Sequence, residues 1–200
     1  ERREILLQVA AGDDDLQTPL RRQPVIAIAG AQQPARLRDG IVAAGEYDSL
    51  CDRIDELVRG LYDEAGVGVV WVEPIPQLYA RLRENIRPYP RQRAVCHLVT
   101  DRDDAEYEFH VANNDGRSSS IFDFAQHRDI WPGVGFERTI CLRSLTLQTL
   151  VKREAIDLDD YPGLVLDTQG SELLVLKGAG ELLRRFRFIQ AEAADFESYA

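Results

Sequence analysis

The stretch Pro162–Glu192, PGLVLDTQGSELLVLKGAGELLRRFRFIQAE, decides the fold of this chain. Its apolar run Leu164–Leu166 is too short for a helix, and it ends on Asp167 before a turn at Gly170. Leucines at three- and four-residue spacing then predict a helix, and Phe186–Ala191 predicts a second buried strand. This order predicts a compact β-α-β unit.

An acid follows each of the two strands predicted in this unit, Asp167 after the first and Glu192 after the second. In open α/β sheets, ligands bind beyond the carboxyl ends of the strands, so both carboxylates are candidate catalytic groups. A carboxylate placed there can take a proton from a substrate or orient it. Capping of the helix that begins near Ser171 is an alternative role for Asp167.

Length and composition fit one globular domain. The chain has 200 residues, of which 44% are hydrophobic and 29% charged. Its net charge of −10 opposes binding to nucleic-acid phosphates and to anionic lipid. No apolar run is long enough to cross a bilayer. We therefore expect no nucleic-acid partner and no membrane span.

Three cysteines, Cys51, Cys96 and Cys141, are far apart and form no CxxC pair. This odd, scattered set is typical of a reducing compartment and argues against a disulfide framework or a zinc site. The three histidines lack ligand spacing as well. We therefore expect a cytoplasmic protein without a bound metal.

The chain divides into a lead-in and one domain. Apolar residues in Glu1–Ala11 recur at helical spacing, which predicts a helical lead-in over residues 1–24. Residues 25–200 form the domain. We expect this domain to be truncated at its C-terminus, because the sequence stops soon after a predicted strand.

Within the domain, buried strands alternate with amphipathic helices. Strands are predicted over Pro24–Ala29, Val67–Val72, Arg93–Val99, Tyr107–Val111 and Arg138–Leu142. Helices are predicted over Ala35–Ala44, 46–61, Leu78–Ile86 and Leu145–Arg153, and a polar loop or lid over Asn113–Asp129. The order predicts an α/β fold with a mostly parallel sheet.

Glu73 follows the strand Val67–Val72 and precedes Pro74. In nucleotide-binding α/β folds, an acid at the end of the second strand accepts hydrogen bonds from both hydroxyls of a ribose. The alternative is a carboxylate that caps the helix containing Leu78. The spacing does not decide between these two roles.

Several motifs are spread over about the last two-thirds of the chain: VWVEPIPQLYARLRENI at Val70–Ile86, RSSS at Arg117–Ser120, Thr146-Leu147, GLVLDTQGSELLVLKGAGELL at 163–183 and IQAE at 189–192. Together they resemble the FkbM family of S-adenosylmethionine-dependent methyltransferases, and the segment Leu166–Ala179 is the most diagnostic. The resemblance implies a Rossmann-like methyltransferase fold, with helices on both faces of the sheet and an antiparallel strand near the C-terminus. It also implies S-adenosyl-L-methionine as the cofactor.

On the acceptor side, the resemblance implies that Asp167, Gln169 and Glu172 lie near the transferred methyl group. Asp167 is the main candidate for a general base or an orienting acid, with Glu192 as the second. Ser118 and Ser119 are candidates for binding the acceptor, and a solvated turn is the alternative.

On the cofactor side, the resemblance implies that Glu73 holds the ribose, and Asp101 in the following acidic turn is a further candidate. The fold normally places a glycine-rich loop roughly 20 to 30 residues before the acid of the second strand. Gly45 fits this spacing, whereas Gly30 and Ala31 follow the better predicted strand. Both loops lack the acidic residue that precedes the glycine in the family.

The leading hypothesis is therefore a methyltransferase that acts on a hydroxyl of a sugar, glycan or polyketide-like product. Its partner is a small-molecule or glycan acceptor, and a homo-oligomer is left open. The alternative is a non-catalytic binding or scaffold module that keeps the fold after its glycine loop has decayed. A dinucleotide or nucleotide-sugar enzyme gains little support, because GxGxxG is absent.

Overall fold

The computed structural model describes residues 4–10, 25–29, 59–60, 62–194 and 197–200. The candidate cofactor residues Gly30, Ala31 and Gly45 lie outside this set, as does the helix predicted over Ala35–Ala44. Of the helix predicted over 46–61, residues 59–60 are described and helical.

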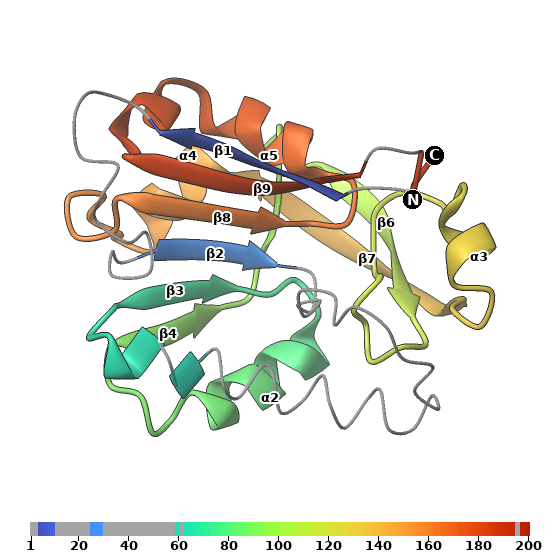
Figure 1. Ribbon diagram of the computed structural model, residues 1–200, viewed down its shortest axis with the longest axis horizontal. Coiled ribbons are helices and arrows are strands. Elements are labelled where there is room, and N and C mark those ends of the chain that lie inside the picture. The colour runs from blue at the N-terminus through green and yellow to red at the C-terminus, as the bar shows by residue number, and fades with distance from the viewer. Residues whose placement is uncertain (1–3, 11–24, 30–58, 61, 195–196) are drawn as a thin grey trace.

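A six-stranded sheet forms the centre of the molecule, in the order β1-β9-β8-β2-β3-β4 (Figure 1). Its strands are β1 (Glu4–Ala10), β2 (Val25–Ala29), β3 (Val69–Val72), β4 (Gln92–Val95), β8 (Gly163–Asp167) and β9 (Phe188–Ala194). The pairs β9-β8, β8-β2, β2-β3 and β3-β4 are parallel, which confirms the predicted mostly parallel sheet. The antiparallel pairing near the C-terminus is that of β9 with β1.

The helical lead-in predicted over Glu1–Ala11 is wrong, because residues 4–10 form strand β1. This strand pairs with β9 along its whole length, from Glu4 opposite Ala194 to Ala10 opposite Phe188. Short apolar segments fit either a helix or a strand, and here the free edge of β9 decides, because it satisfies the backbone of the segment.

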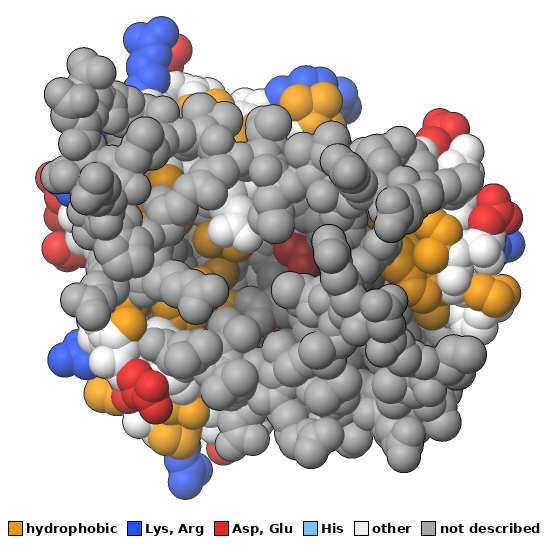
Figure 2. All heavy atoms as spheres, viewed as in Figure 1, with side chains coloured by type: hydrophobic (Ala, Val, Ile, Leu, Met, Phe, Trp, Pro, Cys, Tyr) orange, Lys and Arg blue, Asp and Glu red, His pale blue; other side chains and the backbone are white. Residues whose placement is uncertain are grey.

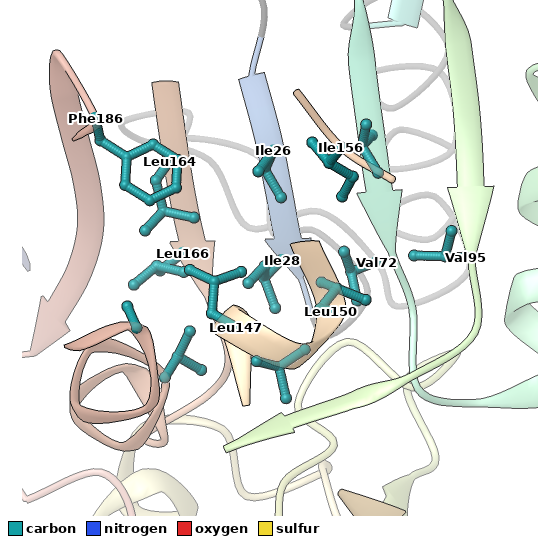
Figure 3. Close-up of a cluster of buried hydrophobic side chains, with 14 of the residues drawn as sticks. Ile26, Ile28, Val72, Val95, Leu147, Leu150, Ile156, Leu164, Leu166 and Phe186 are labelled. Carbon is teal, nitrogen blue, oxygen red and sulfur yellow. The ribbon is translucent and has the colours of Figure 1, made fainter. Parts of the chain in front are cut away.

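Helices cover both faces of the sheet, as predicted. On one face, α4 (Leu147–Arg153) and α5 (Glu172–Ala179) pack on the strands, with Leu147 and Leu150 under β8 and β2 (Figure 3). On the other face, the end of α2 (Pro76–Asn85) packs near Trp71. Side chains alternate along β2 and β3, so each strand contributes to both cores.

A smaller sheet of order β5-β7-β6 lies beside the main one. It contains β5 (Leu98–Thr100), β6 (Glu106–Ala112) and β7 (Phe136–Thr146), with α3 (His127–Ile130) near the end of the β6-β7 pair (Figure 1). The strand predicted over Arg93–Val99 is therefore two strands, β4 and β5, which belong to different sheets. The chain leaves the main sheet between them, at Cys96 and His97.

The last predicted helix ends in a tighter turn. After α5 the chain continues as η2, a 3-10 helix over Gly180–Arg185, and Gly180 has a positive φ of 51°. Among the described residues, no helix combines the length and the apolar character needed to cross a membrane.

Candidate active site

Glu73 and Asp167 stand in one row at the carboxyl ends of the central strands. Ala29, the last residue of β2, pairs with Asp167. Ile28 pairs with the last residue of β3, so Glu73 is level with Ala29 on its other side. The acids after β3 and β8 thus flank the end of β2, where open α/β sheets bind their ligands.

Glu192 belongs to the same row by its backbone. Ala191 of β9 pairs with Leu166 of β8, so Glu192 is level with Asp167. The side chain of Glu192 lies outside what the structure describes, and its catalytic role stays a prediction. Figure 2 shows acidic side-chain atoms near the middle of the molecular face that lies over the arrowhead ends of β8, β2 and β3 in Figure 1.

Glu73 is a buried carboxylate with unused bonding capacity. Only 6% of the residue surface is exposed, and Oε1 accepts a hydrogen bond of 2.7 Å from the backbone N–H of Ile75. Within the described part of the chain, Oε2 accepts no hydrogen bond. Burial raises the pKa of Glu73 to about 8, although the Ile75 bond lowers it in part. Such a group suits a ligand that brings its own donors, as the two hydroxyls of a ribose do.

The geometry argues against the alternative role of Glu73 as a cap of helix α2. Helix α2 begins at Pro76, with Ile75 as its N-cap residue. A capping carboxylate would accept from the second or third backbone N–H of the helix, whereas Glu73 bonds the N–H of the N-cap residue itself. Glu73 therefore stabilises the turn from β3 into α2, and its predicted contact with a ribose stays a prediction.

Asp167 is held by the loop that follows β8. Its Oδ1 accepts a hydrogen bond of 2.5 Å from Nε2 of Gln169. Ser171, not Asp167, is the N-cap residue of α5, so the capping alternative for Asp167 is wrong. Gln169 has a φ of 53°, an uncommon backbone conformation for a residue other than glycine.

Glu172 supports the same loop from the first turn of α5. Its carboxylate accepts hydrogen bonds from the backbone N–H of Thr168 at 2.6 Å and of Gly170 at 3.1 Å. A negative charge at this helix end is also favoured by the helix dipole. The structure thus shows Glu172 bound to its own loop, and its predicted contact with an acceptor stays a prediction.

Ser118 and Ser119 are both buried, each with 1% of its surface exposed, so the alternative of a solvated turn is wrong. The Ser119 hydroxyl accepts a hydrogen bond of 3.0 Å from the backbone N–H of Ala112. The Ser118 hydroxyl accepts one of 2.9 Å from the side-chain amide of Asn114. These bonds hold the loop against the end of β6.

Ser120 links this loop to the loop after β8. It is fully buried, and its hydroxyl donates a hydrogen bond of 2.7 Å to the backbone carbonyl of Gln169. The predicted acceptor residues Asp167, Gln169 and Ser118 therefore lie in one connected region, although the two loops are far apart in the sequence.

Tyr199 was not predicted from the sequence, and it joins the same region. Its hydroxyl donates a hydrogen bond of 2.6 Å to Oε1 of Gln169 and lies 3.5 Å from the carbonyl oxygen of Ser118. An isolated antiparallel β-bridge between Phe124 and Tyr199 brings the tyrosine into this region. No spacing or motif in the sequence marks Tyr199, because its partners come from distant segments.

His127 is a second residue missed by sequence reasoning. Its ring is stacked on Phe124 with centroids 4.2 Å apart, and Nε2 lies 3.1 Å from the Ser118 hydroxyl. Burial lowers the pKa of His127 to about 4, so the ring is neutral at pH 7. His127 shows no ligand spacing in the sequence, so no pattern there predicted its position beside Ser118.

Asp101 follows β5, a strand of the smaller sheet, and not one of the main-sheet strands that carry Glu73 and Asp167. Its carboxylate is 3.7 Å from Nε of Arg102. A Cβ atom added at Gly178 of α5 would lie 3.2 Å from the Cα atom of Asp101. The structure thus places Asp101 where α5 crosses β5, and its predicted role in cofactor binding stays a prediction.

Comparison with known proteins identifies the family of this chain. Residues 39–200 match the family described as methyltransferase FkbM domain. The 2-O-methyltransferase NoeI of Sinorhizobium fredii (strain NBRC 101917 / NGR234) is 32% identical over 133 residues, which cover 64% of this chain and 54% of that protein. The chain thus spans about half the length of this curated relative. No solved structure matches. Because the family match covers well over half of its residues, the chain belongs to the FkbM methyltransferase family.

Proposed function

We propose that this protein is an S-adenosyl-L-methionine-dependent O-methyltransferase that acts on a hydroxyl of a sugar, glycan or polyketide-like product. The observation that carries the proposal is the row in which Glu73 and Asp167 flank the end of β2. The family match spans both residues. The name of the relative NoeI states 2-O-methyl transfer, which supports a hydroxyl as the acceptor.

Glu73 is the residue proposed to hold the cofactor. Its buried carboxylate keeps one oxygen for a ligand, and the diol of a ribose supplies two donors. When bound, S-adenosyl-L-methionine would supply a sulfonium methyl group for transfer to the acceptor oxygen, with S-adenosylhomocysteine as the leaving group. Gly45 or the Gly30-Ala31 turn would meet the methionine end of the cofactor.

Asp167 is the residue proposed to act on the acceptor. Its carboxylate takes the proton of the acceptor hydroxyl while that oxygen gains its new bond to carbon. The side-chain amide of Gln169 donates a hydrogen bond to Oδ1 of Asp167, and this bond fixes the carboxylate relative to the end of β8. Because the displacement is in line, positioning of the two reactants supplies most of the remaining rate enhancement. Glu192 is the second proposed acid.

The second candidate function is a non-catalytic binding or scaffold module with a methyltransferase fold. The sequence supports it at one point, since no acidic residue directly precedes Gly30 or Gly45. Because an odd, scattered set of cysteines is typical of a reducing compartment, we propose a cytoplasmic location for the protein under both candidate functions.

A labelled methyl group tests the proposed activity. The intact protein is incubated with methyl-deuterated S-adenosyl-L-methionine and a small-molecule and glycan extract, and products are searched by mass spectrometry for a gain of one labelled methyl group. We expect labelled products with the wild-type protein and much less label with Asp167→Asn. Absence of labelled products together with absence of cofactor binding would favour the scaffold module.

A further inference from the structure

We propose that Tyr199 is a positioning residue for the acceptor-side carboxylate, because its hydroxyl fixes the side-chain amide of Gln169 with the N–H group facing Asp167. This inference rests on the proposed function, in which Asp167 is the proton acceptor. The three side chains form one chain of hydrogen bonds, 2.6 Å from Tyr199 to Gln169 and 2.5 Å from Gln169 to Asp167.

The direction of these bonds follows from what each group can do. The Oε1 atom of Gln169 only accepts, so the hydroxyl of Tyr199 donates to it. The Ser118 carbonyl competes weakly for the same proton, because it lies 3.5 Å from the hydroxyl oxygen. The amide then presents Nε2 to Asp167. Reversal of the amide would set Oε1 against a carboxylate oxygen, which is unfavourable while Asp167 is ionised.

The backbone at Gln169 is held in place separately from its side chain. The positive φ of Gln169 is sustained by the Ser120 hydroxyl, which donates to its backbone carbonyl at 2.7 Å. Backbone conformations of this kind persist where the surrounding structure holds them, and they cluster at functional sites. Because Ser120 fixes the backbone of Gln169, the freedom that remains to the side-chain amide is rotation. The hydrogen bond from Tyr199 restricts this rotation.

The ring and the hydroxyl of Tyr199 have separable roles. The ring covers Gly170, where an added Cβ atom would lie 3.0 Å from a ring carbon. It also lies with its centroid 5.7 Å from those of Phe124 and His127. Backbone hydrogen bonds from Ala125 and His127 to the carbonyl of Ser198 fix this segment. A change to phenylalanine keeps the ring packing and removes only the hydroxyl.

The effect of Tyr199 on the titration of Asp167 must be distinguished from that of the other ionisable groups nearby. Glu172 in α5 binds the amides of the same loop, and Glu73 lies beyond β2. Glu192 is level with Asp167 in β9. His127 is neutral above about pH 5, since burial lowers its pKa to about 4. None of these groups bonds the Oε1 atom of Gln169 among the described contacts, so substitution at Tyr199 leaves their bonds in place.

The test is a titration of Asp167 that needs neither cofactor nor acceptor. The carboxyl ¹³C signal of Asp167, assigned with Asp167→Asn, is followed by NMR between about pH 3 and pH 8. We expect Tyr199→Phe to raise the titration midpoint by about one pH unit, because the hydrogen bond that favours the ionised form is loosened. Gln169→Met should give a similar rise, and the double variant should add nothing further.

Two further proteins keep the test independent of folding. Tyr161→Phe removes a hydroxyl that lies over Gly68, and it should leave the Asp167 midpoint unchanged. 3-Fluorotyrosine at position 199 keeps the hydroxyl and makes it a stronger donor, so it should lower the midpoint. An unchanged midpoint in both proteins altered at Tyr199, while Gln169→Met shifts it, would overturn the proposal.

This design separates the inference from the proposed function. If the midpoint shifts but no labelled methyl product is found, the positioning contact stands and the activity is in doubt. If methyl transfer proceeds and the midpoint does not respond to Tyr199, the contact has no positioning role and the proposed function is unaffected.

Discussion

Glu73 and Asp167 stand level with each other on either side of Ala29, at the carboxyl ends of β3 and β8. Neighbouring strands are about 4.8 Å apart, so the two backbones are separated by roughly 10 Å across β2. One acid is buried with a raised pKa, and the other is bound by the Gln169 amide. We therefore propose different roles for the two acids, with Glu73 binding the cofactor and Asp167 acting on the acceptor.

Cofactor affinity should depend on pH through Glu73. The pKa of Glu73 is about 8 in the free protein, and ribose hydroxyls bind best to the ionised carboxylate. Binding therefore releases a proton below about pH 8, so the affinity for S-adenosylhomocysteine should rise by up to tenfold per pH unit as pH increases toward 8. Calorimetry across this range checks the slope. Glu73→Gln should bind more weakly and show a flatter profile, and an equal slope in both proteins would contradict the assignment.

Glu73 should also lower the stability of the free protein at high pH. Its folded-state pKa of about 8 lies above the reference value of 4.5, so the folded protein binds the extra proton between these values. The free energy of unfolding should therefore fall as pH rises from 4.5 to 8. Glu73→Gln removes this loss. The unfolding temperature of the variant, relative to that of the wild type, should therefore increase as pH rises. The exposed Glu84→Gln in the same region is the control and should show no such gain.

His127 should have the opposite pH dependence. Its folded-state pKa of about 4 lies below the reference value of 6.5, so the unfolded protein binds more protons between these values. Stability is full above pH 6.5 and falls as pH decreases toward 4. His127→Phe loses the contact with Ser118 and should cost about 1 kcal/mol at pH 7. Denaturant unfolding should show this deficit shrinking on acidification, and a deficit that grows would contradict the account.

Gly178 should tolerate no side chain. A Cβ atom there would collide with the backbone carbonyl oxygen of Thr100, where α5 crosses β5. Gly178→Ala should lower the free energy of unfolding by about 1 to 3 kcal/mol, despite the higher helix propensity of alanine. Gly133→Ala is the matched control, since among the residues that the structure describes, its chain neighbours aside, no heavy atom lies within 4 Å of the added Cβ atom. Similar urea midpoints for the two variants would show that the crossing can relax.

The parts of the fold that follow from local pattern could be predicted from the sequence. The strands β2, β3 and β8 and the helices α2, α4 and α5 have clear periodicity, and the acids at Glu73 and Asp167 follow from where their strands end. β1 could not be predicted, because its pairing partner β9 lies at the other end of the chain. The break between β4 and β5 was missed for a related reason, since it depends on which sheet each half joins.

The support around the candidate site is also nonlocal. Tyr199, Ser120 and His127 reach the region through contacts between segments that no spacing rule connects. Sequence reasoning could name Gln169 but not the tyrosine that orients it. The glycine loop expected at Gly45 or Gly30 lies outside the described residues, so its assignment stays a prediction.

The most direct test of the two-acid site is calorimetric binding of S-adenosylhomocysteine to three proteins at one pH. We expect the wild type to bind, Asp167→Asn to bind with nearly the same affinity while its turnover falls, and Glu73→Ala to bind at least about tenfold more weakly, a loss of roughly 1.4 kcal/mol. Absence of binding to the wild type, or a loss caused by Asp167→Asn and not by Glu73→Ala, would contradict the division of the site into a cofactor side and an acceptor side.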